Sequence, residues 1–142
     1  MLQVKHLLAE KGSEVYSVGP DEPVLNAIRT MADRYIGALL VMRGDELVGI
    51  VSERDYARKV ILKGRHSDDT PVSDIMSPNV LTVGPEDTID TCMRLCTDRR
   101  VRHLPVVDHR KVVGVVSIGD LVKALISEQS TQIEQLQRYI AG

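Results

Sequence analysis

The chain has 142 residues, of which 43% are apolar, 27% charged and 3% aromatic, and its formal net charge is −2. A charge this close to zero provides no field toward nucleic acid or anionic lipid, and so few aromatic residues are atypical of single-strand nucleic-acid binders. The sequence begins without an apolar signal segment, and its longest apolar runs are too short to cross a bilayer. We therefore expect a cytoplasmic protein without membrane contact.

Secondary-structure signals occur twice in the same order along the chain. In the first half they predict a helix over 4–9, a β segment over 15–18, a helix over 23–35, β-rich runs over 38–42 and 47–52, and a helix from Glu53. The second half gives the corresponding segments 72–76, 80–83, 87–100, 103–107 and 112–117, and a helix from Ile118. Each half therefore has the order β-α-β-β-α after a short leading helix.

This order reflects an internal duplication. Displacing the sequence by 65 positions aligns residues 15–60 with 80–125 without a gap, and about fourteen of the 46 positions are identical. Chance would give about three at average residue usage. The strongest matches are Val-Gly-Ile-Val-Ser at 48–52 against Val-Gly-Val-Val-Ser at 113–117, and Asp55 against Asp120.

The duplication predicts an α+β fold of two repeats packed face to face around a pseudo-two-fold axis, because a unit of about 60 residues is marginal alone. We place the first repeat at 1–66, the second at 67–128 and a C-terminal amphipathic helix at 129–142. We expect that helix to dock on a partner subunit or on the module itself. An ACT-like fold is the main competitor, but its β-α-β-β-α-β order fits the 65-residue period less well.

The most informative motif ends the last strand of each repeat. Ser52 is followed three residues later by Asp55, and Ser117 by Asp120. One interpretation is a helix capping box, in which each serine and aspartate satisfies the other's backbone N–H. The other is a binding site, because a helix N-terminus suits phosphate and a carboxylate there suits a ribose diol. The two are compatible.

Cations lie close to both motifs, and we predict phosphate contacts for Arg54, Arg102 and His103. The first repeat has Gly37-Ala38 where the second has Arg102-His103, so two sites would be chemically unequal. The sequence contains none of the common nucleotide-hydrolysis, dinucleotide, metalloprotease or serine-hydrolase motifs, so we predict no enzyme and no catalytic residue. Cys92 and Cys96 have no companion ligands at metal-site spacing, and we interpret them as core residues rather than redox or metal groups.

Together, the repeated Val-Gly-Ile-Val-Ser-x-x-Asp element, Arg-His-Leu-Pro-Val-Val-Asp at 102–108 and Val-Ser-Asp-Ile-Met at 72–76 resemble the tandem CBS-domain pair, or Bateman module. The resemblance covers about residues 4–127 and looks like the stand-alone two-domain subgroup. It implies a regulatory, non-enzymatic module that binds an adenosine-containing ligand (AMP, ADP, ATP, S-adenosylmethionine or NAD(H)) in clefts between the repeats. It implies no required cofactor, and a homodimer that signals to an unknown protein partner.

Carried onto this sequence, the resemblance assigns four groups of residues. Ribose contacts fall to Asp55, Asp120, Ser52 and Ser117; phosphate contacts to Arg54, Arg102 and His103; and adenine contacts to Ser17, Thr82, Ile36 and Val101. No metal ligand is implied. Gly37-Ala38 departs from the family's basic pair, which weakens the case for phosphate in the first repeat.

Two other functions compete with nucleotide sensing. The protein could be a structural dimerisation or adaptor module whose Ser-x-x-Asp pairs are only caps. It could also bind RNA or DNA through the basic stretch 54–66, although the near-neutral charge makes nucleic acid an unfavourable partner.

Overall fold

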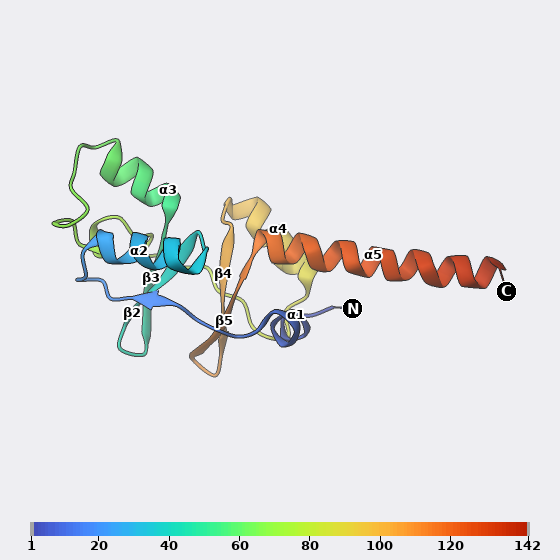
Figure 1. Ribbon diagram of the computed structural model, residues 1–142. Coiled ribbons are helices and arrows are strands. Elements are labelled where there is room, and N and C mark those ends of the chain that lie inside the picture. The colour runs from blue at the N-terminus through green and yellow to red at the C-terminus, as the bar shows by residue number, and fades with distance from the viewer. Residues whose placement is uncertain (1, 142) are drawn as a thin grey trace. The chain divides into compact units, whose positions relative to one another are not determined.

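The computed structural model describes residues 2–141, which form two compact units (Figure 1). The first-repeat unit comprises residues 15–81. The second-repeat unit combines residues 82–141 with residues 2–14. The chain is thus a mixed α+β protein with two repeats and a C-terminal helix, as the sequence predicts. None of the helices within residues 2–141 is long and apolar enough to span a lipid bilayer.

The first-repeat unit is built on a three-stranded sheet of order β1-β2-β3. Its elements are β1 (Ser17–Val18), α2 (Val24–Arg34), β2 (Ala38–Arg43), β3 (Glu46–Ser52), α3 (Glu53–Tyr56), the π-helical turn η1 (Ala57–Ile61) and the 3-10 turn η2 (Val72–Asp74). Strand β1 is parallel to β2, and β2 is antiparallel to β3. Its buried core is Val18, Val24, Ala27, Met31, Leu39, Val41, Val51, Val60, Val72 and Ile75.

The second-repeat unit repeats this plan with one helix from the start of the chain. Its elements are α1 (Val4–Lys11), α4 (Ile89–Arg99), β4 (His103–Asp108), β5 (Lys111–Ser117) and α5 (Ile118–Ala141). Helix α1 packs against the β5 strand so closely that a side chain at Gly114 would meet Leu8. The separate helix predicted at 129–142 is continuous with the helix that closes the repeat, giving one α-helix of 24 residues over the described part.

The β segment predicted at 80–83 is reduced to a single parallel bridge between Val83 and Val106. In the first repeat, the Leu40 N–H donates to the Tyr16 carbonyl and β1 forms. The position equivalent to Leu40 is Pro105, which has no N–H to donate. The second repeat therefore loses one bond of the ladder and with it the short strand.

The compact units differ from the predicted division at residues 66 and 67. Residues 2–14 join the second repeat: Val4 is fully buried, and its N–H donates to the Asp87 carbonyl at 2.9 Å. Residues 67–81 join the first repeat, where Val72 and Ile75 belong to the core. Each repeat is thus completed by the segment that precedes the other one in sequence.

Candidate functional site

In the first-repeat unit, the Ser-x-x-Asp motif forms a complete capping box at the start of α3. The Asp55 N–H donates to Ser52 Oγ at 3.2 Å, and the Ser52 N–H donates to Asp55 Oδ2 at 3.0 Å. The Ser52 hydroxyl donates to the same Asp55 oxygen at 3.1 Å. Lys59, one turn later, lies 3.4 Å from Asp55 Oδ1. The partners of this carboxylate therefore all lie within four residues of it in sequence.

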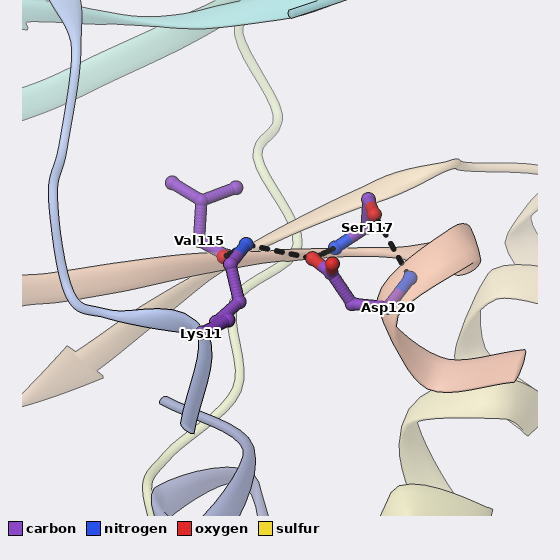
Figure 2. A network of polar contacts seen from close by, with 4 residues as sticks. All are labelled: Lys11, Val115, Ser117 and Asp120. Carbon is purple, nitrogen blue, oxygen red and sulfur yellow. Dashed lines mark hydrogen bonds and ion pairs between the residues drawn. The ribbon is translucent and has the colours of Figure 1, made fainter. Parts of the chain in front are cut away.

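In the second-repeat unit, the same motif also contacts a residue from the start of the chain. The Ser117 N–H donates to Asp120 Oδ2 at 2.9 Å, and the Asp120 N–H donates to Ser117 Oγ at 3.1 Å. The ammonium of Lys11, at the end of α1, lies 2.7 Å from Asp120 Oδ2 and donates to the Val115 carbonyl at 2.8 Å. Figure 2 shows Lys11 reaching across to both acceptors from a separate helix.

The Asp120 carboxyl has a lowered pKa. Burial alone would raise this pKa. The hydrogen bond and charge of Lys11 and the hydrogen bonds of Ser117 together lower it by more than burial raises it. Asp120 is therefore a half-buried anion whose charge is neutralised by a cation from α1. Lys11 was absent from the residues predicted from sequence. No local pattern marks a single lysine at a helix end as the partner of a carboxylate 109 positions later.

The remaining first-repeat residues predicted for binding lie at the sheet end where β3 stops and β2 starts. Ser52 is paired with Ala38, and Ser17 with Leu40 on the other side of β2. Ile36 precedes β2 and is half-buried. The structure thus brings Ser17, Ile36 and the Ser52 motif to one end of one sheet, whereas Arg54 is exposed on α3.

The second repeat gathers its predicted residues at the equivalent end. His103 is paired with Ser117, and the Ile118 N–H at the start of α5 donates to the Arg102 carbonyl at 2.8 Å. The half-buried Val101 lies one residue before Arg102, and the exposed Thr82 lies one residue before the Val83 bridge. Both predicted basic residues therefore lie beside the first turn of α5.

The two sheet ends carry their cations at different positions. Arg54 has Gly119 as its equivalent, whereas Arg102 and His103 replace Gly37 and Ala38. Consequently the second repeat places cations on the strand side of its Ser-x-x-Asp motif and the first repeat places one on the helix side. This is the chemical inequality that the sequence predicts.

The cysteines are core residues, as predicted. Cys92 is 0% and Cys96 3% exposed on α4. Burial, followed by the charges of Asp87 and Cys96, raises the pKa of the Cys92 thiol to about 11, and burial raises that of Cys96. Both are therefore neutral thiols at physiological pH and poor nucleophiles. Within residues 2–141, no group of three or more His, Cys, Asp or Glu side chains is arranged to hold a metal ion.

The fold and the doubled motif define a CBS-domain pair, a regulatory module. The CBS domain model matches residues 5–62 and 72–127, and the chain belongs to this family. A crystal structure of the CBS-domain protein NE2398 has a TM-score of 0.84 and 52% identity, covering 87% of this chain and 97% of that one. A signal-transduction protein with CBS domains from Burkholderia ambifaria has a TM-score of 0.87 and 48% identity, covering 89% and 96%.

Other relatives differ in length or are more distant. CBSX3, a mitochondrial CBS-domain protein of Arabidopsis thaliana, is 42% identical over 127 residues, and the match covers 86% of this chain but only 62% of that protein. YhcV of Bacillus subtilis is 30% identical, with 83% and 84% covered. The CBS pair of MJ0100, crystallised with 5′-methylthioadenosine and S-adenosyl-L-methionine, has a TM-score of 0.80 at 22% identity and shows the fold alone.

Proposed function

We propose that this protein is a cytoplasmic sensor that binds an adenine nucleotide (AMP, ADP, ATP or NAD(H)) at the Ser-x-x-Asp ends of its repeats. The Asp120 carboxylate accepts the ribose hydroxyls and Ser117 lies near ribose or phosphate. Val101 and Thr82 contact adenine. In the first repeat, Asp55, Ser52, Ile36 and Ser17 have these roles, and Arg54 contacts phosphate.

One observation carries the proposal: Arg102 and His103 lie beside the first turn of α5, next to an ionised carboxylate. A helix N-terminus and two basic residues attract a phosphate, and a neighbouring carboxylate accepts hydrogen bonds from a diol. A nucleotide carries both groups. The ligands crystallised with MJ0100 both contain adenosine, which is the ligand class proposed here.

The proposal makes the second repeat the stronger phosphate site, because Gly37-Ala38 replaces the basic pair in the first. It also gives Lys11 a part in ligand binding. The ribose hydroxyls would have to share Asp120 with an ammonium that already lies 2.7 Å from it. Occupancy at Asp120 and the position of the α1 end are therefore linked.

We propose further that the protein acts as a homodimer and passes ligand occupancy to a protein partner. A ligand that binds two conformations unequally changes their populations, and this changes partner affinity by the same coupling free energy.

A structural adaptor is the second candidate, because both hydrogen bonds of each capping box are present. In that case the aspartates only end strands and start helices. The two functions predict different consequences when the carboxylates are removed.

Isothermal titration with AMP, ATP and NADH, on the wild type, Asp55→Ala and Asp120→Ala, distinguishes them. We expect Asp120→Ala to weaken binding by about tenfold or more, as for a lost charge-assisted hydrogen bond. It should lower the free energy of unfolding by only about 1 kcal/mol, as for a lost cap.

Thr88→Ala is a matched control. Thr88 caps α4 of the same unit by accepting from the Thr91 N–H at 3.1 Å, so its loss costs similar stability. Thr88→Ala should leave ligand affinity unchanged. If the folded wild type gives no heat with any of the three nucleotides, the sensor is refuted and the adaptor function stands.

A further inference from the structure

We propose that α5 pairs in parallel with α5 of a second copy of this chain, as a short two-stranded coiled coil. The observation behind this is a length of helix that the other described residues leave exposed. Helix α5 begins at Ile118 and extends beyond the rest of its unit (Figure 1). All side chains from Gln129 to Ile140 are exposed. An isolated helix of about that length is marginal in water and needs a packing partner.

The exposed part carries an apolar stripe, which we call the α5 stripe. It consists of Val122, Ile126, Gln129, Ile133, Leu136 and Ile140. Its apolar members are between 41% and 78% exposed, with Ile133 at 56% and Ile140 at 78%. Their spacing alternates between four and three residues, which is the repeat that keeps one seam facing a partner helix.

The stripe does not face the unit to which α5 belongs. The side of α5 that packs on its own unit includes the fully buried Leu121 and the half-buried Ala124 and Leu125. At about 100° per residue, the centre of the α5 stripe lies roughly a quarter-turn around the helix from this side. The helix therefore docks on its own unit with one face and presents the stripe with another, which favours an external partner.

The residues of the stripe point to a second copy as that partner. With Ile126, Ile133 and Ile140 at heptad position a and Leu136 at d, the seam has the pattern that favours parallel two-stranded coils. Gln129, at heptad position d, is the single polar residue in the seam. Beyond Ile126, the flanking e and g positions are uncharged: Ser130, Gln132, Gln137 and Tyr139. Two identical helices thus meet without like-charge repulsion.

The seam also continues toward the body of the unit. A shallow apolar groove on the first turns of α5 is lined by Ile118, Gly119, Val122, Lys123, Ile126 and Ser127. Its lining includes the first two members of the α5 stripe, so paired helices would close this groove at the same time.

Sedimentation equilibrium of the full chain tests the pairing. We expect Ile133→Asp to weaken dimerisation by about a hundredfold, because it buries an unpaired charge in the seam. Gln135→Asp introduces the same charge two residues later, about 200° around the helix on its outer face, and should leave the dimer unchanged. The Ile133 side chain is 56% exposed, so its variant should unfold like the wild type.

A disulfide tests the direction. Ile126→Cys lies near one end of the stripe, so two copies bring residue 126 to residue 126 only when the helices are parallel. We expect oxidation to give a covalent dimer from Ile126→Cys and not from Ser127→Cys. The native Cys92 and Cys96 are buried and do not compete.

A wild type that is monomeric at about 100 µM, well above the Kd of a stable dimer, would overturn the proposal. A dimer that Ile133→Asp leaves intact, or the absence of the 126–126 disulfide, would overturn it as well. These outcomes are separate from the proposed nucleotide function, because the stripe contains none of its binding residues. A dimer that survives Ile133→Asp would still be compatible with a homodimeric sensor that pairs through other surfaces.

Discussion

At the scale of single residues, the two Ser-x-x-Asp motifs are chemically alike but electrostatically different. Asp55 is paired with Lys59 in the π-helical turn that follows its helix, whereas Asp120 is paired with Lys11 from α1. The position equivalent to Lys11 in the duplication is Met76, which packs against Gly49 instead of pairing with a carboxylate. Only the second Ser-x-x-Asp motif is therefore paired with a cation from a distant part of the sequence.

Lys11→Met, which installs the residue found at the equivalent position, tests the ion pair. We expect the free energy of unfolding at pH 7 to fall by about 0.5 kcal/mol, since the pair is partly exposed and screened by solvent. The lowered pKa of Asp120 contributes stability above the ordinary value of 3.8, and this contribution is lost as pH falls through the folded pKa. Urea unfolding should thus show a gap between wild type and variant at pH 7 that narrows as the pH is lowered below 3.8.

Asp120→Asn supplies the control for this prediction. In that background Lys11→Met should have a smaller effect at pH 7, because the charge it pairs with is gone and only the hydrogen bond to the Val115 carbonyl is lost. A gap between wild type and Lys11→Met that persists undiminished at acid pH would mean that Lys11 stabilises by packing rather than by charge.

At the scale of elements, both repeats use left-handed backbone at equivalent points without glycine. Tyr35 and Arg100 end α2 and α4 with φ values of 54° and 55°. In each repeat the next N–H, of Ile36 or Val101, returns to a carbonyl of the preceding helix, at Met31 or Cys96. This closure directs the chain from the helix to the strand, and it places Ile36 and Val101, two of the four proposed adenine contacts, at the same point of each unit.

The β4–β5 hairpin turn is a second strained element. His109 and Arg110 both have positive φ, of 49° and 67°, which is the geometry of a two-residue turn that prefers Asn-Gly. Replacing both by Asn-Gly should raise the free energy of unfolding by about 1 kcal/mol. In the β2–β3 turn, Gly44 has φ 61°, and Gly44→Ala should cost about 1 kcal/mol. Thermal unfolding of both variants tests these two predicted stability changes. A destabilised Asn-Gly variant would contradict the assignment of strain to the β4–β5 turn.

At the scale of the whole molecule, the second-repeat unit depends on a segment remote in sequence. Helix α1 lies in the second-repeat unit through Val4 and Leu7, and the Ile89 N–H donates to the Leu2 carbonyl at 3.1 Å. The start of the chain is thus part of the structure that carries Asp120. The first-repeat unit, in contrast, is one continuous range, and residues 67–81 extend it directly.

Leu7→Ala tests this dependence. The cavity left by a buried leucine should lower stability by about 2–3 kcal/mol. Hydrogen exchange should quicken most in β4 and β5, which belong to the same unit, and less in β2 and β3. Glu10→Ala on the exposed side of α1 is the control and should change neither. Equal loss of protection in β2 and β3 would mean that α1 stabilises the two units alike.

The sequence alone predicts most of the secondary structure and the helix caps. This is possible because the duplication lets the elements assigned in one half be checked against those of the other. The alternating and helical periods predict α2, α4 and both hairpins within a residue or two, and the Ser-x-x-Asp spacing predicts the caps that the structure contains. Such features depend on contacts between near neighbours. Three others were decided by tertiary structure, because each depends on residues far apart in the chain. Pro105 removes the strand before it only through a ladder bond across the sheet, α1 packs with the second repeat through remote buried contacts, and Lys11 meets Asp120 only once both are folded.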